Sequence, residues 1–271
     1  MNAILPWIRA NAIALATVEA GQGFADLKRL GPLIGDARIV SLGEATHGTR
    51  EFFRLKHRLL EYLVAELEFT IFAIEANYSE CLRINDYVLY GTGDPAEALA
   101  GTRFWTWDTE EVLLLIAWMR SWNLNHARRV KFYGFDMQFS TEAGLGVLDY
   151  LKRVAPDLAQ GAAQELWPLC DDTSAERFHA LGEATREAAL NSAAGILEAF
   201  ARERERWCAL TSRLDWHLER LNAVVLEQSA GVGYPRSHAM SPWPRTLRRC
   251  SRWKGPHQRR SCGPTMATRR G

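Results

Sequence analysis

The arrangement of apolar and polar residues predicts alternating strands and helices over the first half of the chain. Residues 38–42, 69–76 and 130–135 are short apolar runs between polar segments, which is typical of buried strands. Between the first two runs, over 51–67, leucine and phenylalanine recur every three or four residues, the spacing of an amphipathic helix. This alternation favours an α/β fold with a small, mostly parallel sheet and flanking helices.

Further helices are predicted before the third strand. Residues 1–20, 78–90 and 109–125 carry apolar positions at helical spacing. Asp94 and Pro95 favour the start of a short helix, because aspartate caps free amides and proline suits the first turn. Five apolar contacts are expected in the first helix: Ile4, Trp7, Ile8, Ile13 and Leu15.

A long helical region is predicted after the third strand, over about 141–230. Three tryptophans are expected to anchor its core: Trp167, Trp207 and Trp216. We expect residues 1–235 to form one hydrolytic α/β domain that includes this helical lobe. Residues 236–271 are expected to be a basic, irregular tail that is not native to the fold.

Composition agrees with an ordinary globular protein: of 271 residues, 47% are hydrophobic and 24% are charged. No apolar run is long enough to span a bilayer, and the N-terminus lacks the pattern of a signal peptide. The five cysteines are odd in number and widely spaced, so they indicate neither a disulfide framework nor a zinc site. We expect a cytoplasmic protein with no cofactor and no membrane partner; composition leaves its oligomeric state open.

Charge is distributed unevenly along the chain, although the net charge is only +1. No aspartate or glutamate follows Glu227, and residues 228–271 hold ten lysines and arginines. Basic clusters beside Trp243 and Trp253 can bind nucleic acid or an anionic membrane. A non-catalytic remnant with a nucleic-acid-binding tail is therefore an alternative function, but we do not expect nucleic acid to be a partner.

The turn after the first strand carries the candidate catalytic residues. Glu44 and His47 stand three residues apart between Gly43 and Gly48, and glycines permit a tight turn. A neighbouring carboxylate raises the basicity of imidazole and fixes its tautomer, so the pair can activate water for attack on a carbonyl. The second strand ends on Glu75, which we expect to lie in an adjoining strand, at the crevice where α/β sheets bind ligands.

Three more residues are candidates for supporting or binding roles, each with a structural alternative. Lys56 either faces the site or is an exposed helical lysine. Trp105 either lines a pocket for a bulky apolar substrate or packs in the core, and Asp108 beside it is expected to cap the next helix. Asp136, after the third strand, either belongs to the site or caps a helix.

Three motifs that would indicate other reaction classes are absent from the sequence. No G-x-S-x-G segment is present, so a serine-hydrolase mechanism lacks its nucleophile, and neither a phosphate-binding loop nor a dinucleotide fingerprint occurs. Two carboxylates and a histidine can hold a metal. A metal-dependent hydrolase that uses Glu44, His47 and Glu75 therefore remains an alternative.

Four separate segments, in order, resemble the erythromycin esterase family, which includes succinoglycan biosynthesis-type proteins. The segments are SLGEATHGTREFFRLKHRLLEYLV, FTIFAIEANYSECLRINDYV, FWTWDTEEVLLLIAWMRSWN and VKFYGFDMQ. The resemblance is close over residues 30–140 and looser to about 236. It implies hydrolysis of a small-molecule ester, which in the type members is the macrolactone of a macrolide antibiotic and confers resistance.

The resemblance also implies residue roles. His47 matches the family's general base, which activates water without an acyl-enzyme, and Glu44 matches the carboxylate beside it. Glu75 matches the acidic residue that ends the second strand. Lys56 stands where some relatives carry arginine.

The C-terminal segment departs from the family pattern. Relatives continue through a further strand and a histidine-rich motif similar to Trp-Ala-His-Asn-Gly-His, whereas this chain keeps only the helix start that Arg236 and Met240 fit. Residues 262–268, CGPTMAT, have a codon spelling that reads as this motif two bases later. We therefore hypothesise a shift of the reading frame, which would leave this chain truncated and weakly active.

Resequencing the gene tests this hypothesis. We expect the codons of residues 262–268 to spell the histidine-rich motif in the shifted frame. An unbroken frame with other codons at these positions would remove the support.

Overall fold

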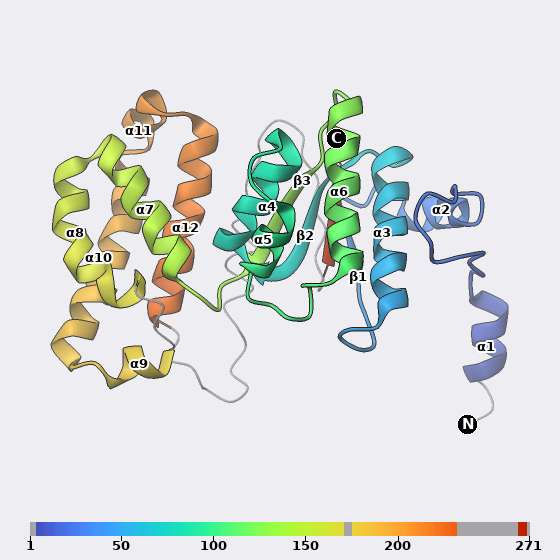
Figure 1. Cartoon of the computed structure of the whole chain (residues 1–271), viewed down its shortest axis with the longest axis horizontal. Helices are drawn as coiled ribbons and strands as arrows, with labels where there is room; N and C mark the ends of the chain where they lie inside the picture. Colours follow the sequence, from blue (N-terminus) through green and yellow to red (C-terminus); the bar gives the residue numbers. More distant parts are fainter. Residues whose placement is uncertain (1–3, 171–174, 232–264, 270–271) are drawn as a thin grey trace. The chain divides into compact units, whose positions relative to one another are not determined.

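The computed structural model of the chain describes residues 4–170, 175–231 and 265–269 (Figure 1). Contacts divide the chain into two compact units. The first comprises Met1–Ile74, Ile84–Phe132 and Lys254–Gly271, and the second comprises Glu75–Arg83 and Tyr133–Trp253. None of the helices in the described ranges combines the length and apolar character that crossing a bilayer requires.

The first part of the chain alternates strands and helices, and the predicted α/β class with a small sheet is confirmed. The elements are α1 (Ile4–Asn11), η1 (Leu27–Leu30), α2 (Gly31–Ile34), β1 (Ile39–Leu42), α3 (Arg50–Ala65), β2 (Phe69–Asn77), α4 (Tyr78–Tyr90), α5 (Pro95–Ala100), α6 (Glu110–Asn125) and β3 (Lys131–Asp136).

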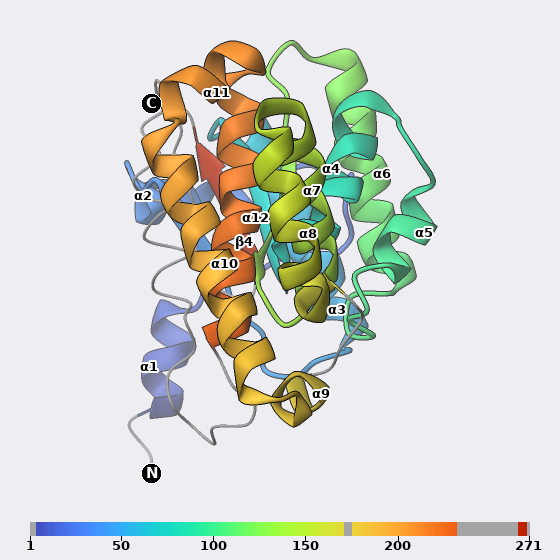
Figure 2. The same ribbon diagram turned by 90° about the vertical axis from the view of Figure 1, so that its left-hand side faces the viewer.

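Helices continue after β3: α7 (Thr141–Val154), α8 (Pro156–Cys170), α9 (Ala175–Ala180), α10 (Glu183–Arg202), α11 (Arg204–Leu210) and α12 (Arg213–Gly231). Figure 2 shows α7, α8, α10 and α12 side by side. Their shared core includes Tyr150, whose ring stacks on Phe200 at 5.3 Å, and the buried indoles of Trp207 and Trp216. Those two tryptophans are core residues as predicted, whereas Trp167 is 59% exposed and the prediction for it is wrong.

The sheet has the strand order β1-β4-β2-β3, in which β4 is Thr265–Arg269. β4 runs antiparallel to both β1 and β2, so β1 and β2 are parallel to each other but do not adjoin. The prediction that they are neighbouring strands is therefore wrong, because a strand from the other end of the chain lies between them. That strand also lies inside the segment predicted to be irregular, of which residues 236–264 and 270–271 are outside the described part.

Local sequence accounts for the helix starts. The Asp94 side chain accepts hydrogen bonds from the amides of Ala96 and Glu97 and caps α5 as predicted. Thr109, rather than the predicted Asp108, caps α6 through the amide of Val112. A hydroxyl immediately before the first helical residue reaches the free amides of the first turn.

The N-terminal helix is shorter than predicted. α1 ends at Asn11 and has no buried residue, and Trp7 is 66% exposed. Ile4, Ile8 and Leu15 are also exposed, so these side chains are not core residues of the described structure. Apolar spacing alone identified a helix here but not a partner for its face.

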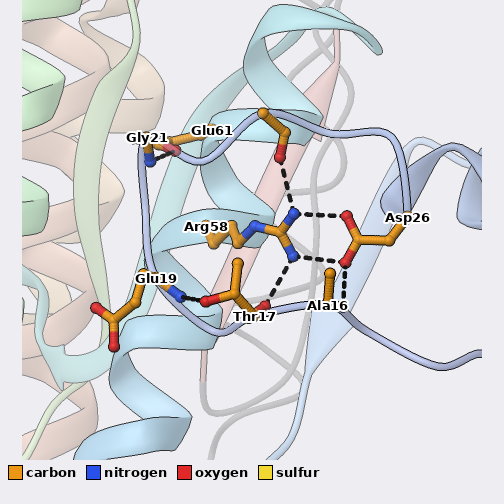
Figure 3. Close-up of polar contacts among 8 residues, drawn as sticks. Ala16, Thr17, Glu19, Gly21, Asp26, Arg58 and Glu61 are labelled. Carbon is orange, nitrogen blue, oxygen red and sulfur yellow. Dashed lines mark hydrogen bonds and ion pairs between the residues drawn. The ribbon is translucent and has the colours of Figure 1, made fainter.

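The segment after α1 is held against α3 by one buried arginine (Figure 3). The guanidinium of Arg58, 1% exposed, donates to both carboxylate oxygens of Asp26 at 2.5 and 2.9 Å. It also donates to the carbonyl oxygens of Thr17 and Gly23, both at 2.8 Å. One side chain thus fixes three points of the loop.

Two further hydrogen bonds tighten this loop. The Ala16 amide donates to Asp26 at 2.7 Å, and the Gly21 amide donates to Glu61 on α3, also at 2.7 Å (Figure 3). The Arg58 guanidinium and the Ala16 amide hold the pKa of Asp26 well below its usual range, because both stabilise the carboxylate.

Replacing Arg58 with methionine is expected to destabilise the protein by roughly 3 kcal/mol, because it leaves the Asp26 carboxylate and two loop carbonyls without their buried donor. Chemical denaturation at neutral pH measures this loss. Arg50→Met is the matched control on the same helix: the Arg50 side chain is 57% exposed, so its ion pair with Glu111 contributes less than about 1 kcal/mol. Equal losses of unfolding free energy in the two variants would contradict the role of Arg58 in holding the loop.

Candidate active site

The turn between β1 and α3 carries two of the predicted catalytic residues. It runs from Gly43 to Thr49, and α3 begins at Arg50. Gly48 has φ +78°, in the left-handed region where a side chain would be strained, so glycine is required there. The hydroxyls of Thr46 and Thr49 hydrogen-bond across the turn. These features give the turn a defined shape.

Glu44 and His47 contact each other within this turn. His47 Nδ1 lies 2.7 Å from Glu44 Oε1. A carboxylate oxygen accepts, so Nδ1 carries the proton and Nε2 is left as the basic nitrogen. The Glu44 side chain is 4% exposed and that of His47 is 58% exposed. The acid is therefore buried while the ring remains accessible to water or a substrate.

Lys56 holds the other oxygen of Glu44. Its Nζ forms an ion pair with Glu44 Oε2, and the Lys56 side chain is 6% exposed. Lys56 is therefore not an exposed helical lysine, and it faces the turn that carries Glu44. The Glu44 carboxylate bridges a lysine on one side and a histidine on the other, which fixes its orientation.

An aromatic wall stands beside these groups. The Lys56 Nζ lies 5.3 Å from the ring centroid of Trp107 and 5.6 Å from that of Phe53. The Trp107 ring also meets the His47 ring edge to face at 6.4 Å. Trp105 is 75% exposed and lies beside Gly48, so the core-packing alternative for it is wrong. Sequence reasoning missed Trp107, and the only signal for it was the repeated tryptophan of the FWTWD segment.

Glu75 and Asp136 belong to the second unit. Glu75 lies in β2, two residues before its end, and is half-buried. Its approach to Glu44 and His47 stays a prediction. Asp136 ends β3, is 6% exposed, and accepts hydrogen bonds from the Met137 amide and the Gln138 side chain. It does not cap a helix, because α7 begins at Thr141.

A second histidine lies on α3 but is unsuited to act as the base. Burial lowers the pKa of His57 to about 4. Its Nε2 has no hydrogen-bond partner and lies 3.7 Å from Glu61, while its ring packs against Trp118 at 5.9 Å. His57 is therefore neutral at neutral pH and enclosed, in contrast to the accessible His47.

Within the described ranges, no three or more histidine, cysteine, aspartate or glutamate side chains are grouped to hold a metal ion. The metal-dependent alternative uses Glu44 and His47 from the first unit and Glu75 from the second, and it stays a prediction. Chelation followed by metal analysis tests it.

The structure is that of an α/β protein with a Glu–His turn after its first strand, and sequence comparison gives its family. The pattern of the erythromycin esterase family matches residues 64–245, about two thirds of the chain. The chain therefore belongs to the erythromycin esterase family. The matched range includes Glu75, Trp105 and Asp136 but begins after the turn that carries Glu44 and His47.

Individual relatives agree with this assignment. The chain is 28% identical over 219 residues to erythromycin esterase type II of Escherichia coli, covering 81% of this chain and 49% of that protein. A Bacillus cereus protein of known crystal structure superposes with a TM-score of 0.76 at 29% identity, covering 87% of this chain and 57% of its own. A succinoglycan biosynthesis protein superposes with a TM-score of 0.74 at 28% identity, covering 86% and 57%. The chain thus spans about half the length of these relatives.

The depressed pKa of His57 predicts a stability change in mild acid. The unfolded chain binds a proton at this histidine near its ordinary pKa of about 6.5, whereas the folded state binds it only near 4. The stability from neutral, buried His57 is therefore present above about pH 6.5 and lost as the pH falls towards 4. His57→Phe should reduce the drop in unfolding free energy between pH 7 and 5 by roughly 1–2 kcal/mol.

Denaturant titrations at the two pH values measure this difference. His126→Phe is the control, because His126 is exposed on the C-terminal end of α6. Burial also raises the pKa of Glu61, which offsets part of the effect at the lower pH. If the unfolding free energy of His57→Phe falls between pH 7 and 5 as much as that of the unaltered chain, the lowered pKa of His57 is contradicted.

Proposed function

We propose that this protein hydrolyses a carboxylic ester with a water molecule that His47 activates. The observation that carries the proposal is the 2.7 Å contact between His47 Nδ1 and the buried Glu44 carboxylate. That contact directs the basic Nε2 away from the acid, and the ring is exposed enough to meet water. Family membership supports hydrolase chemistry in general.

The proposed reaction needs no covalent enzyme intermediate. Nε2 of His47 accepts a proton from water as the oxygen attacks the ester carbonyl, and the carbon–oxygen bond of the leaving alkoxide then breaks. The imidazolium returns the proton to the alkoxide, giving a carboxylic acid and an alcohol. Glu44 stabilises the imidazolium, Lys56 holds Glu44 in place, and Glu75 helps to place the water molecule or to stabilise developing charge.

A bulky apolar ester is the proposed substrate class, with a macrolide-type lactone as its first candidate. Trp105 is 75% exposed beside Gly48, one residue from His47, and offers a flat apolar surface at the edge of the site. The name of the Escherichia coli relative, an erythromycin esterase, supports the same class. On this proposal the activity would confer resistance to macrolide antibiotics.

His47→Gln is expected to lower kcat/KM by about 100-fold or more, because glutamine keeps a polar side chain but cannot accept a proton near neutral pH. Hydrolysis of a panel of nitrophenyl esters and macrolides measures the loss. His126→Gln is the matched control, since His126 is an exposed histidine of the same unit that lies outside the turn.

Both variants are best prepared in the chain as it stands and in a version that is read in the hypothesised frame after Met240. On that hypothesis we expect higher turnover in the second version, because the histidine-rich motif then follows the helical region. Activity that survives His47→Gln would remove the mechanism. Activity that disappears on chelation and returns with added metal would favour the metal-dependent alternative.

A further inference from the structure

Trp107 contacts both of the groups that contact Glu44. Its ring meets that of His47 at 84°, with 6.4 Å between centroids. Its centroid also lies 5.3 Å from the Lys56 Nζ, within the range of a cation–π interaction. The side chain is 2% exposed, so the indole forms an interior wall rather than a surface for substrate.

The loop between α5 and α6, residues 101–109, holds Trp107 in a fixed position. The Trp107 amide donates to the Phe104 carbonyl at 2.9 Å, and the Trp107 carbonyl accepts from the Thr109 amide at 2.8 Å. The indole packs on Phe53 of α3 at 5.6 Å. The loop also contains Arg103 at φ +62°, a left-handed conformation that costs a non-glycine residue energy and is frequent at functional sites.

The turn that carries His47 leaves its ring exposed to solvent, so a contact from another segment is needed to fix the orientation of the ring. Its side chain is 58% exposed, and a single hydrogen bond to Glu44 allows the ring to rotate about its side-chain torsions. An edge-to-face contact with an immobile indole restricts that rotation. Two restraints from different segments, one polar and one aromatic, then hold the ring in one orientation.

Lys56 depends on the same indole. Its ammonium is almost completely removed from water and is paired with Glu44. The aromatic faces of Trp107 and Phe53 supply negative potential on the side that water has left. The indole thereby favours the ion pair that orients the Glu44 carboxylate towards His47.

We propose that Trp107 is a positioning residue. It holds His47 in the Nδ1–H tautomer, and it keeps the Lys56–Glu44 ion pair in the position in which the Glu44 carboxylate accepts from His47. The proposal rests on His47 as the proposed base, but its central prediction concerns the state of the imidazole and not hydrolysis. A positioning indole of this kind acts through His47 and Lys56 and does not itself touch substrate.

Nitrogen-15 NMR of the histidine rings tests the proposal without any substrate. In the unaltered chain, at alkaline pH, we expect His47 to be mainly the Nδ1–H tautomer, with its signal assigned by its loss in His47→Gln. In Trp107→Leu we expect the Nε2–H form, which dominates in a freely hydrated imidazole, to become the major form. Trp107→Phe keeps an aromatic ring and should retain most of the Nδ1–H form.

Trp118→Leu is the matched control. The Trp118 ring packs against His57, with 5.9 Å between centroids, so this variant should perturb the His57 signals and leave the His47 tautomer unchanged. If Trp107→Leu does not fold, nuclear Overhauser contacts between the His47 ring and the Trp107 indole in the unaltered chain decide the matter. Missing contacts, or a folded Trp107→Leu that keeps the Nδ1–H form, would overturn the proposal.

Kinetics separate this proposal from the proposed function. In a chain that hydrolyses esters, Trp107→Leu should lower kcat about tenfold or more with KM changed less than about twofold, because it disturbs orientation and not binding. A raised KM with unchanged kcat would overturn the positioning role. A chain without esterase activity that still shows the predicted tautomer shift would contradict the function and leave the role of Trp107 standing.

Discussion

Charge buried along α3 is the constraint on which this structure depends. Lys56 and Arg58 are both almost fully buried, and residues two apart on a helix point about 200° apart around its axis. A buried ion is tolerated only when paired, so each side of α3 must meet a carboxylate. Asp26 from the N-terminal loop meets Arg58, and Glu44 from the following turn meets Lys56. Two otherwise irregular segments thereby acquire fixed positions.

This constraint links stability to the candidate chemistry. Glu44 can orient His47 only because Lys56 holds its other oxygen, and Lys56 is in place only because α3 is packed. The aromatic lining of Phe53 and Trp107 excludes water from the ion pair, which strengthens it. The accessible imidazole is therefore the outermost member of a chain of contacts whose inner members are enclosed by the core.

Local pattern predicted the features that depend on local sequence. Helical spacing identified α3 and α4, and Asp94 followed by Pro95 identified the start of α5. The pairing of Lys56 could not be read in the same way, because its burial depends on an acid twelve residues earlier that a turn returns to the helix. The position of β4 between β1 and β2 was equally inaccessible, since pairing between distant strands leaves no periodic signal in an arginine-rich segment.

Family membership and the candidate mechanism rest on different parts of the chain, and α3 connects them. The family pattern begins at residue 64, near the end of α3, whereas the Glu–His turn precedes that helix. The connection from α3 to β2 is short and strained, because Glu68 adopts φ +62°. Arg128 holds it by donating to the Glu68 carboxylate at 2.7 Å and to the Val64 carbonyl at 3.0 Å. The start of β2 is thus fixed to the helix that holds Glu44, so the turn and the beginning of the family-matched strand share one helix as their support.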